Sequence, residues 1–271
     1  MTSKRKTLLA LITGIPIGTL GGLIGLGGAE FRLPVLVGLF KYRPRKAIAL
    51  NILISLITVT SSLIFRIGKF SIGGISSLLI VIISIIAGSM TGAFFGADLS
   101  AKISEKLLKR IILIFLICIG TLLIFESFIP FTSGLIVFTA TYQKVILALL
   151  LGLVIGLVSS MLGVAGGELI IPTLILIFGV DIKLAGTASL LISLPTMLIG
   201  IGRHKANKVY DDKKDITGLV LPMGIASIIG AFIGSALINY VSSNTLKLIL
   251  GIILMISALK LFMEKRKNST F

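Results

Sequence analysis

The sequence predicts an all-α membrane protein built from two inverted-topology repeats of about five membrane segments each, with broken half-helices at glycine-rich motifs. Three observations predict this fold. The 271 residues are 56% apolar and only 13% charged, with a mean hydropathy of +1.13, whereas soluble domains contain about 25% charged residues. The chain aligns with itself after a shift of 138 residues, and its cations gather in alternate loops.

The residue counts exclude several classes of protein. The net charge is +16, but the chain has too little polar surface to present a basic face to nucleic acid, so we expect no nucleic-acid partner. Cys118 is the single cysteine and His204 the single histidine, which excludes a disulfide framework and a His/Cys zinc site within one chain. We therefore expect no metal, no cofactor and no catalytic residue.

The internal repeat keeps one register over most of the chain. Residues 9–58 and 147–196 share 18 identities in 50 positions, and these include glycine, glutamate and proline as well as apolar residues. The same shift aligns 92–96 with 230–234. Chance matches among apolar residues would not maintain one register over this length. The predicted division, within a single membrane domain, is a first inverted repeat at 1–128, a linker at 129–144 and a second inverted repeat at 145–271.

Each repeat contains five apolar segments. A helix needs about 20 apolar residues to cross a membrane, and four segments in each repeat come close to this length or exceed it. The remaining segment holds only ten to twelve residues, follows a glycine-rich break and carries a proline, so we predict a half-helix there. The first repeat has its segments at 7–26, 30–40, 45–65, 72–97 and 108–128. The second repeat has its segments at 145–164, 168–179, 184–202, 216–240 and 246–262.

The positions of the cations predict the orientation in the membrane. If every segment changes side and the N-terminus is cytoplasmic, 20 of the 26 cations fall on the cytoplasmic side. This bias agrees with the positive-inside rule. Five crossings per repeat is an odd number, so the second repeat is inverted relative to the first. We expect a multi-pass chain in the cytoplasmic (inner) membrane, with both termini in the cytoplasm.

Two glycine-rich motifs at equivalent positions are the strongest candidates for a binding site. They span 25–34 and 163–172. Glycines let the backbone leave helical geometry and approach a ligand closely, and the free N–H groups at a helix start attract an anion. Two such starts meeting between the repeats would form an anion site; the alternative is close helix packing. The glycine pairs for which we expect packing are Gly14/Gly18, Gly92/Gly96 and Gly230/Gly234.

These motifs resemble those of the sulfite exporter TauE/SafE family. That family has a similar size, a two-fold internal duplication and a Gly-x-Gly-Gly-Gly-x-x-x-x-Pro type of segment near the start of each half. The resemblance covers nearly the whole chain and implies a secondary transporter of sulfite, thiosulfate or organosulfonates, with export favoured, working by alternating access around a midplane site. The pattern maps onto Gly25, Gly27, Gly28 and Pro34 and onto Gly163, Gly166, Gly167 and Pro172, while Ala29 and Ala165 each replace a glycine.

Two glutamates and one arginine lie inside the predicted membrane segments. Glu30 and Glu168 stand at the start of the half-helices, and carboxylates in a membrane are costly and commonly functional. Each of them either carries a proton that is coupled to anion movement or caps the helix start. Arg32 has no basic counterpart, since Ile170 holds the equivalent position. It is either an anion ligand or the ion-pair partner of Glu30, and we favour the ion pair.

A polar stripe on the third segment of each repeat completes the candidate site. Spacings of four and three residues place its members on one helix face, where they either line a cavity or bond neighbouring helices. Arg66 and His204 follow near the end of that segment, as interfacial anchors or as entrance residues. The candidate substrate-binding residues, stripes included, are Gly25, Gly27, Gly28, Ala29, Arg32, Asn51, Ser55, Thr58, Gly163, Ala165, Gly166, Gly167, Ser189, Ser193 and Thr196.

Two other function classes compete with a carrier. A passive anion channel would need no coupling ion, and the paired glutamates and broken helices favour the carrier over it. A membrane-embedded enzyme would need a charged or metal-binding cluster at the membrane interface, and the single histidine and scattered acids form none. The expected partners are a small anion and the lipid bilayer, and the sequence indicates no oligomeric state.

Overall fold

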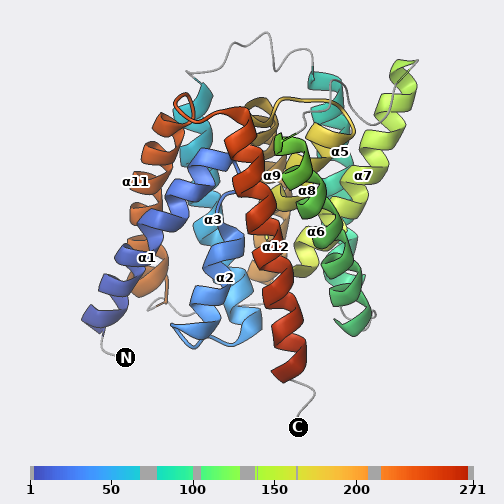
Figure 1. Ribbon diagram of the computed structural model, residues 1–271. Coiled ribbons are helices and arrows are strands. Elements are labelled where there is room, and N and C mark those ends of the chain that lie inside the picture. The colour runs from blue at the N-terminus through green and yellow to red at the C-terminus, as the bar shows by residue number, and fades with distance from the viewer. Residues whose placement is uncertain are drawn as a thin grey trace.

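The computed structural model is all-helical over the residues that it describes, which are 3–67, 78–99, 105–128, 138, 140–162, 164–206 and 215–267 (Figure 1). Each predicted apolar segment falls on one helical element in these ranges. The first half contains α1 (Ser3–Ile24), α2 (Ala29–Gly38), α3 (Pro44–Ile67), α5 (Leu79–Leu99) and α6 (Glu105–Phe128). The second half contains α7 (Thr141–Leu162), α8 (Gly167–Leu176), α9 (Ile182–Ala206), the π-helical turn η1 (Ile216–Val220), α11 (Leu221–Leu237) and α12 (Ser243–Lys267).

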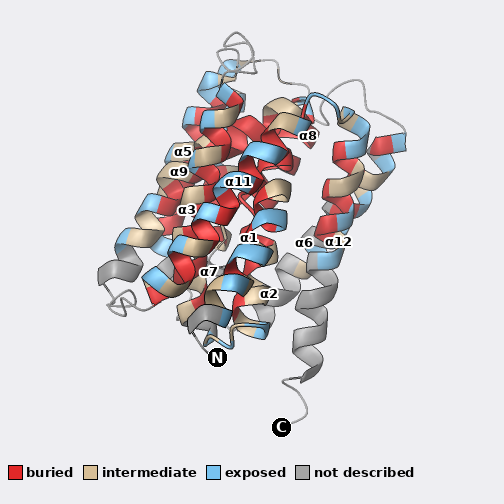
Figure 2. Cartoon of the chain, turned by 90° about the vertical axis from the view of Figure 1, so that its left-hand side faces the viewer, coloured by how far each residue is buried: buried red, intermediate tan, exposed pale blue. Residues whose placement is uncertain are grey.

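Six helical spans among the described residues are long and apolar enough to cross a membrane. Their outward faces carry large apolar side chains, and Ile12, Phe95 and Leu150 are each more than half exposed. Figure 2 shows the same division, with buried residues on the inner faces of the helices and exposed residues on the outer faces. An apolar surface of this extent suits contact with lipid. The spans are Arg5–Ile24, Lys46–Ile67, Leu79–Gly96, Thr141–Ser160, Ile182–Gly202 and Ile216–Leu237.

The helix bounds recur along the chain with the shift of 138 residues that relates the two halves of the sequence. Moving α1 and α2 by this shift reproduces the bounds of α7 and α8, and α5 then ends where α11 ends. The cause is local, because the same lengths of apolar sequence and the same glycine-rich breaks occur in both halves. The two halves therefore follow one order of elements.

Glycines allow helices of the two halves to pack closely. A Cβ atom on Gly18 of α1 would lie 2.7 Å from the Cα atom of Ser227 in α11, and one on Gly156 of α7 would lie 2.7 Å from the Cα atom of Ser89 in α5. These two contacts correspond to each other under the shift of 138 residues, so the packing between the halves is reciprocal. The packing role is confirmed for the predicted glycine pairs, since a Cβ atom at any of them would meet the backbone of a neighbouring helix: Gly14/Gly18, Gly92/Gly96 and Gly230/Gly234.

The two short helices α2 and α8 are the predicted half-helices. Each has ten residues, which is about 15 Å of helix and about half the thickness of the hydrocarbon layer. Each begins after a glycine in the left-handed conformation, with φ of 73° at Gly28 and 81° at Gly166. In both views α2 lies towards the end of the molecule that bears the N and C labels, and α8 lies towards the opposite end (Figure 1 and Figure 2).

Candidate functional site

The two glycine-rich loops meet inside the protein. A Cβ atom on Gly27 would lie 3.8 Å from the Cβ atom of Ala165, and one on Gly167 would lie 3.0 Å from the Cα atom of Leu26. Leu26 and Ala165 are almost fully buried, so this contact belongs to the core. Gly163 lies outside the described residues. The predicted loop residues that the structure brings together here are Gly25, Gly27, Gly28, Ala29, Ala165, Gly166 and Gly167.

Gly25 holds the first loop against α9 of the second half. Its φ is +96°, and a Cβ atom there would overlap the carbonyl oxygen of Gly186. A Cβ atom on Gly186 would in turn overlap the carbonyl oxygen of Ile24. The two backbones touch directly, and only glycine at both positions permits this approach. The position of the first loop is therefore set by a contact between the halves.

Arg32 lies beside the first loop and is fully buried. Its Nη1 atom donates to the Oγ atom of Ser55 at 2.8 Å and to the Oδ1 atom of Asn51 at 3.5 Å. Its Nη2 atom donates to the Oγ1 atom of Thr58 at 3.0 Å and to the Oγ atom of Ser227 at 3.5 Å. The predicted polar stripe of α3 thus surrounds the guanidinium. Ser227 of α11 was not predicted, because a serine 195 residues along the chain gives no local signal of this contact.

The equivalent stripe of α9 is also buried, but Ile170 stands at the position equivalent to Arg32. The Oγ1 atom of Thr196 lies 2.9 Å from the Oγ atom of Ser89 in α5. The same shift makes Ser89 the counterpart of Ser227, so two hydroxyls bond directly here where a guanidinium lies between them in the first half. The members of this stripe are at most 6% exposed: Ser189, Ser193 and Thr196.

The predicted ion pair between Glu30 and Arg32 is wrong. Among the described residues, the hydrogen bonds of Arg32 go to neutral oxygens, and both carboxylate oxygens of Glu30 are buried without a hydrogen-bond partner. Residues two apart on a helix point in different directions, which explains why the two groups do not pair. Glu30 consequently does not cap an N–H group of α2. Glu168 is 7% exposed at the equivalent position in the first turn of α8.

Arg66 is neither an interfacial anchor nor an entrance residue, in contrast to the sequence prediction. It is fully buried, and its Nη2 atom donates to the carbonyl oxygens of Gly22 and Leu23 at 2.8 and 2.7 Å. Because α1 ends one residue later, these carbonyls lack the N–H partners of a continuing helix. The Nη1 atom reaches the Oγ1 atom of Thr187 in α9 at 3.2 Å. Arg66 therefore closes the end of α1; the side chain of its counterpart His204 lies outside the described structure.

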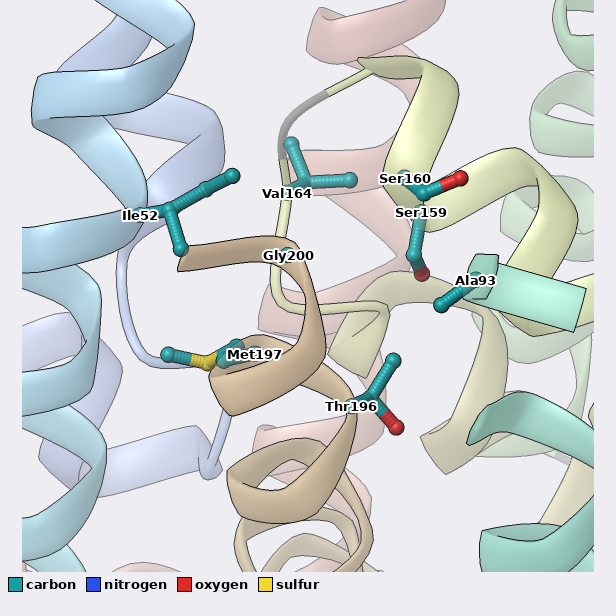
Figure 3. A pocket seen from close by; sticks show the side chains of 8 residues that line it. All are labelled: Ile52, Ala93, Ser159, Ser160, Val164, Thr196, Met197 and Gly200. Carbon is teal, nitrogen blue, oxygen red and sulfur yellow. The ribbon is translucent and has the colours of Figure 1, made fainter. Parts of the chain in front are cut away.

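A small pocket lies beside the second loop (Figure 3). Its volume of about 10 Å³ has room for about one water molecule, so this conformation leaves no space there for an oxyanion with several heavy atoms. Figure 3 shows side chains of α3, α5, α7 and α9 converging on it. Of the predicted site residues only Thr196 lines the pocket. The lining residues are Ile52, Ala93, Ser159, Ser160, Val164, Thr196, Met197 and Gly200.

A polar cluster joins the two halves at the start of α1, α3 and η1. Asp215 accepts a hydrogen bond from Lys6 at 2.9 Å and also contacts Lys46 and the hydroxyl of Tyr42. Burial acts to raise the pKa of Asp215, but the hydrogen bonds from Lys46, Tyr42 and Lys6 outweigh this effect and lower the pKa to about 2. A carboxylate of the second half thus holds cations of the first half.

Replacing Asp215 by asparagine is expected to lower the midpoint of thermal unfolding by a few degrees at neutral pH. Because the pKa in the folded protein lies below its ordinary value of 3.8, the stabilisation is complete above that value and is lost as the pH falls towards about 2. The difference between Asp215→Asn and the unchanged protein should therefore shrink below about pH 4. Unfolding in detergent micelles between pH 7 and pH 3 measures it, with Asp181→Asn at an exposed position as the control. A difference that stays constant to pH 3 contradicts this role.

Comparison with known proteins agrees with the membrane spans and the glycine-rich breaks. A family model described as "Sulfite exporter TauE/SafE" matches residues 1–123 and 147–270, which is nearly the whole chain. The comparison with curated proteins found no match, and neither did the comparison with solved structures. Proteins of the matched family are membrane transporters rather than enzymes, and membership implies export of sulfite or related sulfur anions. The chain belongs to the sulfite exporter TauE/SafE family.

Proposed function

We propose that this protein is a secondary transporter that exports a small sulfur-containing anion, such as sulfite, thiosulfate or an organosulfonate, across the cytoplasmic membrane. The observation that carries the proposal is the meeting of the two glycine-rich breaks in the core, next to a fully buried arginine. Broken helices that meet between repeats are a common way to build a carrier site. Family membership supplies the substrate class.

We further infer that the two halves are inverted repeats, divided as 1–128 and 145–271 with a linker at 129–144. The reciprocal contacts of α1 with α11 and of α7 with α5 support this arrangement. The placement of α2 and α8 towards opposite ends of the molecule supports it as well. The cation-rich cluster around Asp215 supports a cytoplasmic position for the end where both termini lie.

Alternating access is the proposed mode of transport. A pocket with room for about one water molecule cannot accept an oxyanion, so export requires a second conformation in which the core opens. The contacts that join the halves lie on both sides of the loops, with Arg66 and Thr187 on one side and Lys6 and Asp215 on the other. Rocking of one repeat against the other would break these contacts in turn.

Glu30 is the leading candidate for proton coupling, and Glu168 is the second. A buried carboxyl group without a hydrogen-bond partner favours its neutral, protonated form because burial disfavours the charge. Loss and regain of a proton at Glu30 would then change the charge beside the anion site during the transport cycle. Glu168 occupies the equivalent position and is tested in the same way.

Transport by the purified protein in liposomes tests the proposal. We expect saturable, pH-dependent flux of sulfite or thiosulfate that supports counterflow. In Glu30→Gln, flux driven by a pH gradient should fall by about 5- to 150-fold, the usual range of coupling between two ligands, while counterflow should persist. Asp181→Asn removes an exposed carboxylate and is the control.

Three outcomes would count against parts of this proposal. Flux without saturation or counterflow would identify a passive channel. Equal flux in Glu30→Gln, Glu168→Gln and the unchanged protein would remove proton coupling by these residues. No flux of any sulfur oxyanion by folded, correctly inserted protein would overturn the proposed function.

A further inference from the structure

The two fully buried arginines Arg32 and Arg66 differ in how their N–H groups are used. Arg66 donates four hydrogen bonds of 2.7–3.2 Å, three of them to backbone carbonyls at the end of α1. Arg32 makes only two of 3.0 Å or less, to hydroxyls, and its Nε atom has no partner in the described part of the chain. The guanidinium of Arg66 is saturated by fixed groups, whereas that of Arg32 has donor capacity left.

Three further contacts of Arg32 are long. They reach the Oδ1 atom of Asn51 at 3.5 Å, the carbonyl oxygen of Gly27 at 3.4 Å and the Oγ atom of Ser227 at 3.5 Å. Hydrogen bonds weaken towards this distance. An incoming oxygen atom with negative charge would replace such contacts at little cost, because each is a weak bond to a neutral group.

The charge of Arg32 is also not neutralised by a bonded anion. Its hydrogen-bond partners among the described residues carry no charge. A buried cation normally pairs with an anion, since removal from water is costly without one. Glu30 does not serve as this partner, as shown above. A small anion would complete the arrangement.

The second half lacks every charged part of this arrangement. Ile170 stands at the position equivalent to Arg32, and Thr196 bonds directly to Ser89 at 2.9 Å. In the first half, the equivalent hydroxyls of Thr58 and Ser227 both accept from Arg32. An anion shared equally by the two halves would meet an arginine on one side and an isoleucine on the other. The site is therefore expected to be one-sided.

We propose that Arg32, Ser55, Thr58 and Ser227 form a single oxyanion site on the first half of the chain, away from the boundary that the two loops share. This inference rests on the proposed function and specifies its binding site. The planar guanidinium offers parallel N–H donors that match two oxygens on one atom, as in sulfite, thiosulfate and sulfonates. The three hydroxyls come from α3 and α11, so the anion links the first half to the second.

Binding of radiolabelled thiosulfate to the purified protein in detergent tests this site. Arg32→Gln should lower affinity by about 30-fold or more, the effect of removing one partner of a buried charged contact. Arg32→Lys keeps the charge but not the planar donors, and it should retain only part of the affinity. Ser227→Ala should weaken binding by about 3- to 10-fold, since one hydrogen bond to a charged group is lost. Ser89→Ala, at the equivalent position of the second half, should bind like the unchanged protein.

Competition defines the ligand class. Methanesulfonate should displace thiosulfate, whereas chloride at the same concentration should not, because it has no pair of oxygens to match the guanidinium. Equal competition by chloride would overturn the assignment to oxyanions.

The remaining outcomes separate this inference from the proposed function. Unchanged affinity in Arg32→Gln, or equal losses in Ser227→Ala and Ser89→Ala, overturns the one-sided site even if the protein transports sulfite. If Arg32→Gln does not fold, Arg32→Lys and the two serine variants still decide the matter. If folded unchanged protein binds no sulfur oxyanion at all, the site and the proposed function fail together.

Discussion

Gly25→Ala is expected to abolish transport and to lower the stability of the protein by about 2–5 kcal/mol, from the strain of a positive φ and from overpacking. The φ of Gly25 is +96°, and the new Cβ atom would overlap the carbonyl oxygen of Gly186. The obstructing atoms belong to the backbone of α9, so no side chain can turn away to make room. The loop would have to separate from α9, and the contact between the two glycine-rich breaks would be lost with it.

The measurements for Gly25→Ala are the midpoint of thermal unfolding in detergent and the flux of sulfite into liposomes. Gly38→Ala is the matched control, because a Cβ atom on Gly38, the last residue of α2, would have no heavy atom within 4 Å. It should keep both stability and flux. A Gly25→Ala protein with normal stability and normal flux would mean that the contact with Gly186 does not hold the loop in place.

Arg66→Met is expected to lower stability by about 2–6 kcal/mol, since it leaves the carbonyl groups of Gly22 and Leu23 buried without their donors at about 1–3 kcal/mol each. The methionine side chain fills part of the space but donates no hydrogen bond. The end of α1 would then lose its fixed position, and the first glycine-rich loop starts there. Transport should fall together with stability, unlike in Arg32→Lys, where we expect binding to change more than folding.

Unfolding in detergent compares Arg66→Met with Arg43→Met, which removes an exposed arginine in the loop between α2 and α3. The control should unfold close to the temperature of the unchanged protein. Arg66→Lys should fall between the two, because a single ammonium group can reach fewer of the carbonyls than the guanidinium does. Equal stability of Arg66→Met and the control would show that water or other groups satisfy the end of α1.

Much of the fold could be predicted from the sequence because its causes are local. The length of each apolar segment predicts a helix or a half-helix, and the left-handed glycines Gly28 and Gly166 stand where the glycine-rich motifs place the breaks. The packing glycines could be predicted as well, since close approach of two helices requires small residues wherever it occurs. The internal repeat strengthened each of these predictions, because both halves carry the same pattern.

The contacts of the charged groups could not be predicted in this way. Arg32 and Glu30 are close in sequence, which favoured an ion pair, but their directions on α2 separate them. The partner Ser227 comes from a different helix of the other half. Arg66 resembled an interfacial residue at the end of a segment, yet the packing of α3 on α1 buries it. Each of these outcomes depends on which helix faces act as neighbours.

The sequence by itself therefore determined the membrane environment, the ten helical segments, the two breaks and the family, because composition, segment length and motif spacing are properties of the chain alone. Only the tertiary structure decided which of the two arginines serves the end of a helix and which retains donors for a ligand. The physical reason is that a buried guanidinium takes its role from the atoms around it. Packing between the halves surrounds Arg66 with carbonyl oxygens and Arg32 mainly with hydroxyls.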